Sequence, residues 1–475
     1  MPGRSAAAAR SREYPAPRTD SDSATWSVVP GSYAESSLTG DRRTPPPNSG
    51  GLHSNGSGSA PRGPALLDPM IKAVPPRLLG VATGVVLACT ACAATAPSPI
   101  SPATPPSAIA SPARALPADL VTRIDRRGAA TLGNGITGAI VSIVDPARGN
   151  LLKAYGTADT AGTPMTPDVH YRIASVSKTF TADAVLELAG QGRLSLDEPL
   201  TRYVPDIPNG DRITVRDLLG MRAGVYDFTV DSGFLARYEA DPTLPGWTPD
   251  DVLRIIRAHP DKAVAPRTRT VYSNSEYILL GYVLEKAAGQ NAPEYLTGLA
   301  RRRGLPNTSF PTDPTLPSPF SHGYSATGQP PTTSSTTPGS TAEANAPRDA
   351  TASNPLVPWT AGALISTVPD MTRYAPLLAT GAGLPPQIAA QRQRWTPLTP
   401  TGLRVQYGLG ITQLGDWVGH DGSILGYSNM VFYLPAQNAT VVVMVNAADG
   451  NEAPAQALWG DLVKLLYPNS LPQWP

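Results

Sequence analysis

The chain has 475 residues with 38 basic and 37 acidic side chains, and this balance argues against a dedicated surface for nucleic acid or anionic membranes. Its two cysteines, Cys89 and Cys92, are too few for a disulfide framework or a cysteine-based metal cluster. The five histidines are scattered, and no pair has the spacing of metal ligands. The length is ample for a large globular core, and we expect no Cys/His metal cluster in it.

Three segments precede the predicted folded domain. Residues 1–69 are rich in Ala, Ser, Gly, Pro and Arg, which predicts a disordered extension or a mis-assigned start. Residues 70–93 have the form of an export signal, in which Lys72 and Arg77 precede an apolar run too short to span a membrane comfortably. Residues 94–115 are rich in Pro, Ala and Ser, as in a tether to a membrane or cell wall.

The end of the apolar run resembles a bacterial lipobox, in which a cysteine becomes the lipidated N-terminus. The two candidates for lipidation are Cys89 and Cys92, and a lipid anchor would hold the protein at the outer face of the cytoplasmic membrane. The alternatives are plain signal cleavage near Ala93 or Ala94 and a short buried helix. Neither cysteine follows the preferred leucine by three residues, so export is favoured over lipidation.

Residues 116–470 have the pattern of one folded domain. A short helix is predicted over 119–127, then a strand over 136–145 and its hairpin partner over 151–156. A long helix begins near Ser175. Four apolar residues recur along this helix at helical spacing and predict a buried stripe: Val176, Phe180, Ala184 and Leu188.

The middle of the chain is mainly helical. Thr214 caps a short helix, and apolar patterns predict two more over 251–258 and 275–288. Residues 325–355 change abruptly to Ser, Thr, Pro, Gly and Ala, which predicts a low-complexity insertion or surface loop within the domain. A turn and a further helix are predicted over 359–381.

The last part of the chain returns to strands. Strands are predicted over 407–413, 416–422, 427–435 and 440–448, and a final helix over 452–466. The simplest fold class that fits this pattern is a mixed α/β fold (α+β), with strands at both ends of the domain and helices in the middle. An antiparallel sheet formed by both chain ends is flanked by helices, and a helical lobe is inserted between them.

A Ser-x-x-Lys motif, formed by Ser175 and Lys178, lies at the start of the long helix. Residues three apart on a helix share a face, so the hydroxyl and the ammonium can meet. A serine hydroxyl needs an adjacent base to become a nucleophile, and a buried lysine with a lowered pKa can be that base. The alternative is a capping serine and a solvated lysine, because such short motifs often occur by chance.

Two further motifs lie downstream. Tyr272 and Asn274 precede a helix, where the tyrosine can shuttle a proton and the asparagine can bind a substrate carbonyl. His420 and Gly422 lie in a strand-like segment, and a glycine there permits close approach of a substrate backbone. Taken alone, each of these residues is more often structural.

The three motifs together resemble the serine β-lactamase and D-alanyl-D-alanine carboxypeptidase superfamily. They occur in the order Ser-x-x-Lys, Tyr-x-Asn and His-x-Gly, separated by 97 and 148 residues. The resemblance is to the class C β-lactamase-related branch with its exported actinobacterial members. It covers residues 116–470 and includes the stretches at 213–225, 305–311 and 361–371. It implies a β-lactamase/transpeptidase-like fold.

By this resemblance, the first two motifs carry the catalytic chemistry. Ser175 is the acylated nucleophile, and Lys178 and Tyr272 share the proton transfers. Asn274 binds the amide side chain of the substrate. The resemblance implies no metal and no other cofactor.

The third motif is implied to bind substrate. His420 replaces the usual lysine, and the backbone N–H groups of Ser175 and Ser423, just past Gly422, would form an oxyanion hole. The middle residue, Asp421, departs from the usual threonine or serine and would repel a substrate carboxylate if it entered the site. The alternative is that its side chain points away.

These observations predict an exported serine hydrolase that works through an acyl-enzyme. The leading hypothesis is a D-alanyl-D-alanine carboxypeptidase-like, penicillin-binding enzyme that acts on cell-wall stem peptides. The same scaffold is compatible with a carboxylesterase or a β-lactamase, whose substrates are an ester or a β-lactam. The alternative outside the enzymes is a non-catalytic binding protein of the cell envelope.

Overall fold

The computed structural model describes residues 114–133, 135–241, 243–325, 348–399, 405–448 and 454–471. The predicted N-terminal extension, the export signal and nearly all of the tether lie outside these ranges, as do Cys89 and Cys92. Within the described ranges, no helix combines the length and the apolar character needed to span a membrane.

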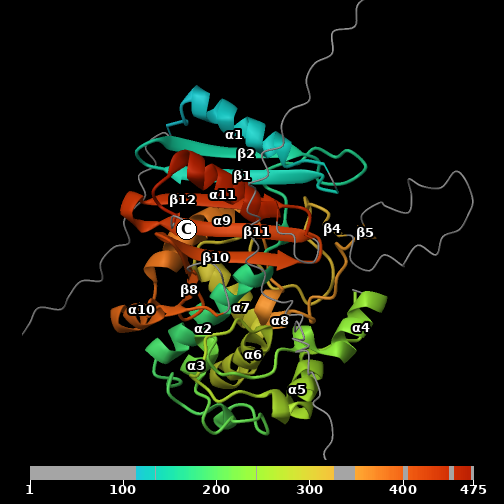
Figure 1. The fold of residues 1–475 in the computed structure, drawn as a ribbon, viewed down its shortest axis with the longest axis vertical. Helices are drawn as coiled ribbons and strands as arrows, with labels where there is room; N and C mark the ends of the chain where they lie inside the picture. Colours follow the sequence, from blue (N-terminus) through green and yellow to red (C-terminus); the bar gives the residue numbers. More distant parts are fainter. Residues whose placement is uncertain are drawn as a thin grey trace, which may run out of the picture. The chain divides into compact units, whose positions relative to one another are not determined.

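The centre of the fold is an antiparallel sheet of eight strands in the order β2-β1-β12-β11-β10-β9-β8-β7 (Figure 1). The strands are β1 Gly138–Asp145, β2 Gly149–Gly156, β7 Thr396–Pro397, β8 Val405–Tyr407, β9 Thr412–Leu414, β10 Trp417–Ile424, β11 Tyr427–Leu434 and β12 Ala439–Val445. In β1, Ala139 lies opposite Val445 of β12. An early strand and a late strand of the described domain therefore pair in one sheet, which confirms the predicted fold class.

Helices cover the sheet. Helix α9 (Val368–Thr380) packs on β1, β11 and β12, and helix α11 (Pro454–Leu466) packs on β11 and β12 (Figure 1). Helix α1 (Ala118–Ala130) packs beside α11. Every residue of β12 is buried, so this run of valines needs apolar neighbours on both faces of the sheet.

The helical lobe occupies the lower part of Figure 1. In the described part of the chain, the lobe contains six consecutive helices and two short helices from later in the chain. The six are α2 Ser177–Gly190, α3 Val215–Leu219, α4 Ser232–Ala240, α5 Pro249–Ala258, α6 Asn274–Ala288 and α7 Ala292–Arg302, and the later two are α8 Trp359–Gly362 and α10 Pro386–Arg392. The predicted cap of α3 is present, since Thr214 Oγ1 accepts a hydrogen bond from the Asp217 backbone. Among these helices, α4, α7 and α10 were not predicted from the sequence.

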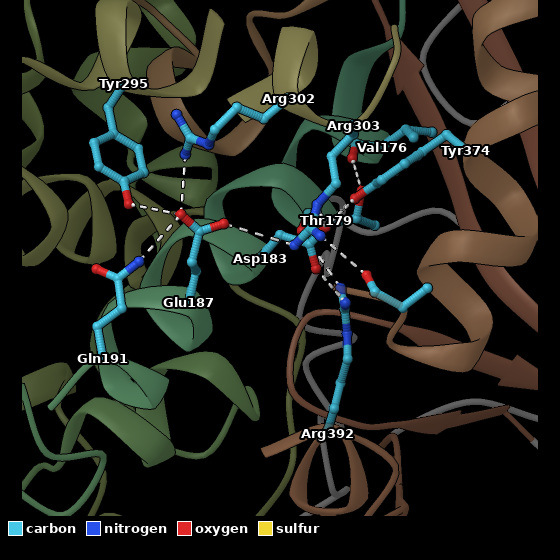
Figure 2. A network of polar contacts seen from close by, with 11 residues as sticks. Val176, Thr179, Asp183, Glu187, Gln191, Tyr295, Arg302, Arg303, Tyr374 and Arg392 are labelled. Atoms are coloured by element: carbon cyan, nitrogen blue, oxygen red, sulfur yellow. Dashed lines mark hydrogen bonds and ion pairs between the residues drawn. The ribbon is translucent and has the colours of Figure 1, made fainter. Parts of the chain in front are cut away.

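Helix α2 is the central helix of the lobe and packs on α6, α7 and α8. The predicted stripe is buried, and so are most residues on the other faces of the helix. A helix enclosed on all sides must satisfy its polar side chains internally. Figure 2 shows how this occurs: Asp183 pairs with Arg392 and accepts a hydrogen bond from Tyr374, while Glu187 pairs with Arg302 and Arg303.

The end of the predicted low-complexity insertion is folded. Residues 326–347 lie outside the described ranges, but strand β5 (Arg348–Asp349) pairs with β4 (Tyr324–Ser325). The residues after β5 supply backbone carbonyls to the buried guanidinium of Arg172. The prediction that the insertion extends to residue 355 is therefore corrected, because a buried cation requires these acceptors.

Candidate active site

Ser175 lies in a tight turn at the entry to helix α2. This turn, η1, spans Ala174–Val176, and the regular helix begins two residues after Ser175. Ala174 is buried and has a φ of 51°, a left-handed conformation that is strained for a residue with a side chain. Strand β3 (Tyr171–Arg172) leads into the turn and pairs with β6 (Ile365–Ser366). Ser175 is only partly buried, so its hydroxyl lies at the edge of the core.

Lys178 is fully buried one turn after Ser175. Its Nζ atom donates to Ser175 Oγ at 3.1 Å, to Asn274 Oδ1 at 2.8 Å and to the Ala361 carbonyl at 2.9 Å. Burial lowers the pKa of Lys178 to about 7, although Asp227 and Asp421 oppose this shift. A substantial fraction of the amine is therefore neutral near pH 7 and able to accept the serine proton.

Tyr272 lies beside this pair. Its ring is partly buried, and the Lys178 Nζ atom lies 4.8 Å from the ring centroid. The hydroxyl is buried and makes no well-formed hydrogen bond within the described part of the chain. Burial raises the pKa of Tyr272 well above its usual value, while the Ser175 side chain opposes the rise. The hydroxyl is thus protonated at neutral pH and available next to the serine.

Asn274 is the first residue of helix α6, and this position fixes its side chain. Its Oδ1 atom accepts the hydrogen bond from Lys178, and its backbone N–H donates to Asp227 Oδ2 at 2.7 Å. The structure therefore brings together all four residues that the sequence predicts in the first two motifs, from two segments far apart in the chain.

Strand β10 passes directly over the turn that carries Ser175. A Cβ atom on Gly422 would lie 2.4 Å from the Ile173 carbonyl oxygen and 3.1 Å from the Ser175 backbone nitrogen. Only glycine permits this approach, so the backbone of β10 can reach the Ser175 N–H. Ser423 follows on the same strand and is partly exposed. The geometry is compatible with the predicted pair of backbone donors.

His420 is enclosed behind this surface. The imidazole is fully buried, its Nε2 atom lies 3.2 Å from the Tyr407 hydroxyl, and its Nδ1 atom lies 2.6 Å from the Asp421 carbonyl oxygen. Burial lowers the pKa of His420 to about 3, so the ring is neutral at physiological pH. Its centroid is 6.3 Å from that of Tyr272. The imidazole therefore has no surface open to a substrate. The Tyr272 ring, which lies beside it, links it to the Ser175–Lys178 pair.

Asp421 points toward the opposite face of the sheet. Its Oδ2 atom accepts a hydrogen bond from Gln456 of helix α11 at 3.0 Å. It borders an apolar cavity between the sheet and α11 that is also lined by Met430, Phe432 and Trp459. Burial raises the pKa of Asp421 to about 6. The sequence left two orientations open, and the structure has the one in which the carboxylate points away.

The described residues contain no group of three or more potential metal ligands. The chemical capacity of the site is that of its side chains: a hydroxyl nucleophile, a partly neutral amine and a protonated phenol. Two of its elements were missed from the sequence, namely the Asp227 carboxylate and the Ala361 carbonyl. Asp227 lies two residues beyond a stretch that carried the family resemblance, whereas a backbone carbonyl has no sequence signal.

The contact between Ser175 and Lys178 is the arrangement expected of a serine hydrolase with a Ser-x-x-Lys pair. The sequence model of the Beta-lactamase family matches residues 120–464, most of the chain, and the chain therefore belongs to this family of serine hydrolases.

Similar proteins agree with this assignment. The D-stereospecific amidohydrolase of a Streptomyces species is 25% identical with a TM-score of 0.62, over 73% of this chain and 98% of that one. The octameric penicillin-binding protein homologue of Pyrococcus abyssi shares the fold at 24% identity and a TM-score of 0.60, over 74% and 79% of the two chains. Protein flp of Staphylococcus aureus (strain COL) is 31% identical over 169 residues, 34% of this chain and 32% of flp. The chain thus spans about a third of the length of this curated relative.

Proposed function

We propose that the protein hydrolyses amide bonds in peptides that contain D-amino acids, through an acyl-enzyme on Ser175. The observation that carries this proposal is the contact between Ser175 and Lys178, in which a buried amine lies 3.1 Å from a partly exposed hydroxyl. Burial lowers the pKa of that amine to about 7, which suits a general base at neutral pH.

The proposed acylation step uses the first two motifs. Neutral Lys178 accepts the Ser175 proton while Ser175 Oγ forms a bond to the substrate carbonyl carbon. As the tetrahedral intermediate collapses, the C–N bond breaks and a proton passes through Tyr272 to the leaving amine. A water molecule then attacks the acyl-enzyme ester, releases the acid product and returns the proton to Ser175.

The proposed oxyanion hole consists of the backbone N–H groups of Ser175 and Ser423. The close approach of Gly422 to the Ser175 turn supports this assignment. Loss of one such donor in hydrolases typically slows turnover by about 100-fold to 1,000-fold. The Asn274 amide supports substrate binding next to Lys178.

The substrate class rests on two kinds of support. The Streptomyces relative is named a D-stereospecific amidohydrolase, and the predicted export signal would bring the protein to cell-wall stem peptides. Asp421 points away from the site, so the repulsion expected against a terminal carboxylate is weakened. A carboxypeptidase-like action on D-alanyl-D-alanine termini, with penicillin binding, is therefore our first candidate.

The neutral imidazole of the third motif favours a second candidate function. His420 is buried and uncharged, so it supplies no cation for a substrate carboxylate, unlike the lysine usual at that position. Substrates without a terminal carboxylate, such as amino-acid amides or short-chain esters, suit this arrangement. We also propose that the protein is exported to the cell envelope, with Cys89 or Cys92 as a site of lipid anchoring.

The test is the intact mass of the full chain after incubation with a penicillin, for wild type, Ser175→Ala and the control Ser195→Ala, which alters an exposed serine. An adduct on wild type and control alone would support the acyl-enzyme and the first candidate. Ring opening without an adduct would indicate a β-lactamase.

Turnover rates on three substrates then distinguish the two candidate functions. We would compare a D-alanyl-D-alanine peptide, D-alanine amide and p-nitrophenyl acetate. Preference for the amide or the ester, with no penicillin reaction, would establish the second candidate. Equal turnover by wild type and Ser175→Ala would refute the mechanism, and absence of all reactions would favour a binding protein.

A further inference from the structure

Residues 221–228, here called the bracket loop, run alongside the segment that carries Tyr272 and Asn274. Besides a bond made by Asp227, four hydrogen bonds join the two segments: Val271 N to Met221 O at 3.0 Å, Ser273 N to Met221 Sδ at 3.2 Å, Gly224 N to Glu276 Oε1 at 3.0 Å, and Phe228 N to Ser275 Oγ at 2.9 Å. The first turn of helix α6 is therefore held from outside by a separate part of the chain.

Asp227 in the bracket loop caps helix α6. Ser273 occupies the N-cap position, but its hydroxyl makes no capping bond. Asp227 Oδ2 instead accepts from the Asn274 backbone N–H at 2.7 Å, and a carboxylate at a helix N-terminus is favoured by the helix dipole. Asp227 Oδ1 accepts from the backbone N–H and the hydroxyl of Thr229 at 2.9 and 2.8 Å. Both carboxylate oxygens are therefore fixed in position.

The cap is connected directly to the proposed nucleophile. Asn274, which Asp227 holds by its backbone, accepts from Lys178 Nζ at 2.8 Å, and the same nitrogen lies 3.1 Å from Ser175 Oγ. A shift of the first turn of α6 would therefore move an acceptor of the Lys178 amine.

The charge of Asp227 also reaches Lys178. Two carboxylates act on the amine, Asp227 from the bracket loop and Asp421 from β10, and both raise its pKa against the effect of burial. The other titratable groups facing it are neutral: His420 on β10 and the phenols of Tyr272 and Tyr277. Removal of one of the two carboxylates would leave burial less opposed and would therefore lower the pKa of Lys178.

We propose that Asp227 is a positioning residue, which caps helix α6, fixes Asn274 as an acceptor for the Lys178 amine, and places a negative charge on the side of the site formed by the bracket loop. This inference rests on the proposed function, because it assigns Lys178 the role of the base. Asp227 touches no reacting atom in this arrangement and acts through the two residues that it holds.

The test compares Asp227→Asn with Asp231→Asn in the full chain. Asp231 is a matched control because it caps the neighbouring helix α4 by accepting from Phe234 N at 2.9 Å, and it is not among the groups that shift Lys178. The readout is the rate at which a fluorophosphonate probe modifies the chain, measured by intact mass from pH 5 to 9, with Ser175→Ala as the blank. Such a probe reports serine activation without knowledge of the substrate.

We expect Asp227→Asn to slow modification about ten-fold near pH 8, since an asparagine cannot accept from both of its partners. We also expect the acidic limb of the rate profile to move by about half a pH unit toward lower pH, because Lys178 loses a stabilising charge. Asp231→Asn should leave the midpoint of the limb unchanged. A purely structural role would lower the rate without moving the limb.

Two outcomes would overturn different statements. If the probe modifies wild type at Ser175 and the Asp227→Asn variant shows the same rate and the same pH profile, the role of Asp227 is refuted. The proposed nucleophile, Ser175, would then stand. No difference between wild type and Ser175→Ala would refute the proposed nucleophile, and the inference with it. Thermal melting of each variant identifies any loss of rate that arises from unfolding.

Discussion

His420 and Asp421 are consecutive residues of β10 whose side chains leave the sheet on opposite faces. The imidazole lies beside Tyr407 and Tyr272, whereas the carboxylate accepts a hydrogen bond from Gln456 on helix α11. Alternation along a strand imposes this separation. The charged residue of the third motif is therefore directed into the layer between the sheet and α11, and the neutral one faces the site.

Asp421→Asn should stabilise the protein at neutral pH. Burial raises the pKa of Asp421 in the fold to about 6, above its ordinary value of 3.8, so the ionised carboxylate disfavours folding at higher pH. The substitution should add about 2–3 kcal/mol at pH 8. The gain should shrink as the pH falls below 6 and vanish below about pH 4, where both states are protonated.

Urea unfolding at pH 4 and pH 8 measures this difference. The control is Asp261→Asn, because the Asp261 side chain is 70% exposed and should have no such pH-dependent effect. A stability gain that is equal at both pH values would contradict the assignment of a raised pKa to Asp421.

Activity should rise with pH with a midpoint near 7, set by Lys178. The pKa of Lys178 is lowered to about 7 and that of His420 to about 3, so of these two groups the lysine is the one that titrates near neutral pH. The pH dependence of kcat/KM should therefore show an acidic limb near pH 7. His420→Asn should retain that midpoint within about 0.3 unit even if the rate falls, whereas Lys178→Ala should abolish turnover. If the midpoint of the acidic limb shifted or the limb disappeared in His420→Asn, the histidine would be the titrating group.

Gly422→Ala should remove activity. The added methyl group would lie 2.4 Å from the Ile173 carbonyl oxygen and would displace β10 from the Ser175 turn. We expect kcat to fall about 100-fold or more, as for the loss of an oxyanion donor. Gly460→Ala is the control, because its methyl group would meet no atom within 4 Å and should add about 0.5–1 kcal/mol of helix stability. An active Gly422→Ala variant would exclude the proposed oxyanion hole.

Asp183→Ala should destabilise the protein strongly. Asp183 on the central helix α2 pairs with Arg392 on helix α10, and both side chains are at least 95% buried (Figure 2). Loss of the carboxylate would leave a buried guanidinium without its counter-charge, at a cost of about 3–5 kcal/mol. Arg302→Ala breaks a pair in the same network whose arginine is 52% exposed, and it should cost less than about 1 kcal/mol. Equal melting temperatures for the two variants would contradict this comparison.

Replacement of residues 326–347 by a short Gly/Ser turn should leave the melting temperature within about 2 °C, since the low-complexity composition predicts little packing. The two ends adjoin, because Ser325 lies opposite Arg348. Deletion of 325–355 should instead unfold the protein at lower temperature, because Arg172 would lose the Thr351 and Ser353 carbonyls. A similar melting temperature for both deletions would show that these carbonyls contribute little.

The sequence alone determined the features that depend on local periodicity. β-branched runs at both chain ends predicted the strands of the sheet, and the i to i+3 spacing predicted that Ser175 and Lys178 would meet, as they do at 3.1 Å. The order and spacing of the three motifs were sufficient to indicate the family. These are properties of neighbouring residues, which a helix or strand places in fixed relative positions.

Only the tertiary structure decided what surrounds those residues. The acceptors around Lys178 come from the turn η1, helix α6 and helix α8, which are distant from one another in the chain. Their convergence buries the amine, and burial lowers its pKa. The same holds for Asp227, whose role follows from packing of the bracket loop on α6. Strand register decided which of His420 and Asp421 faces Ser175, because a shift of one residue exchanges the two faces of a strand.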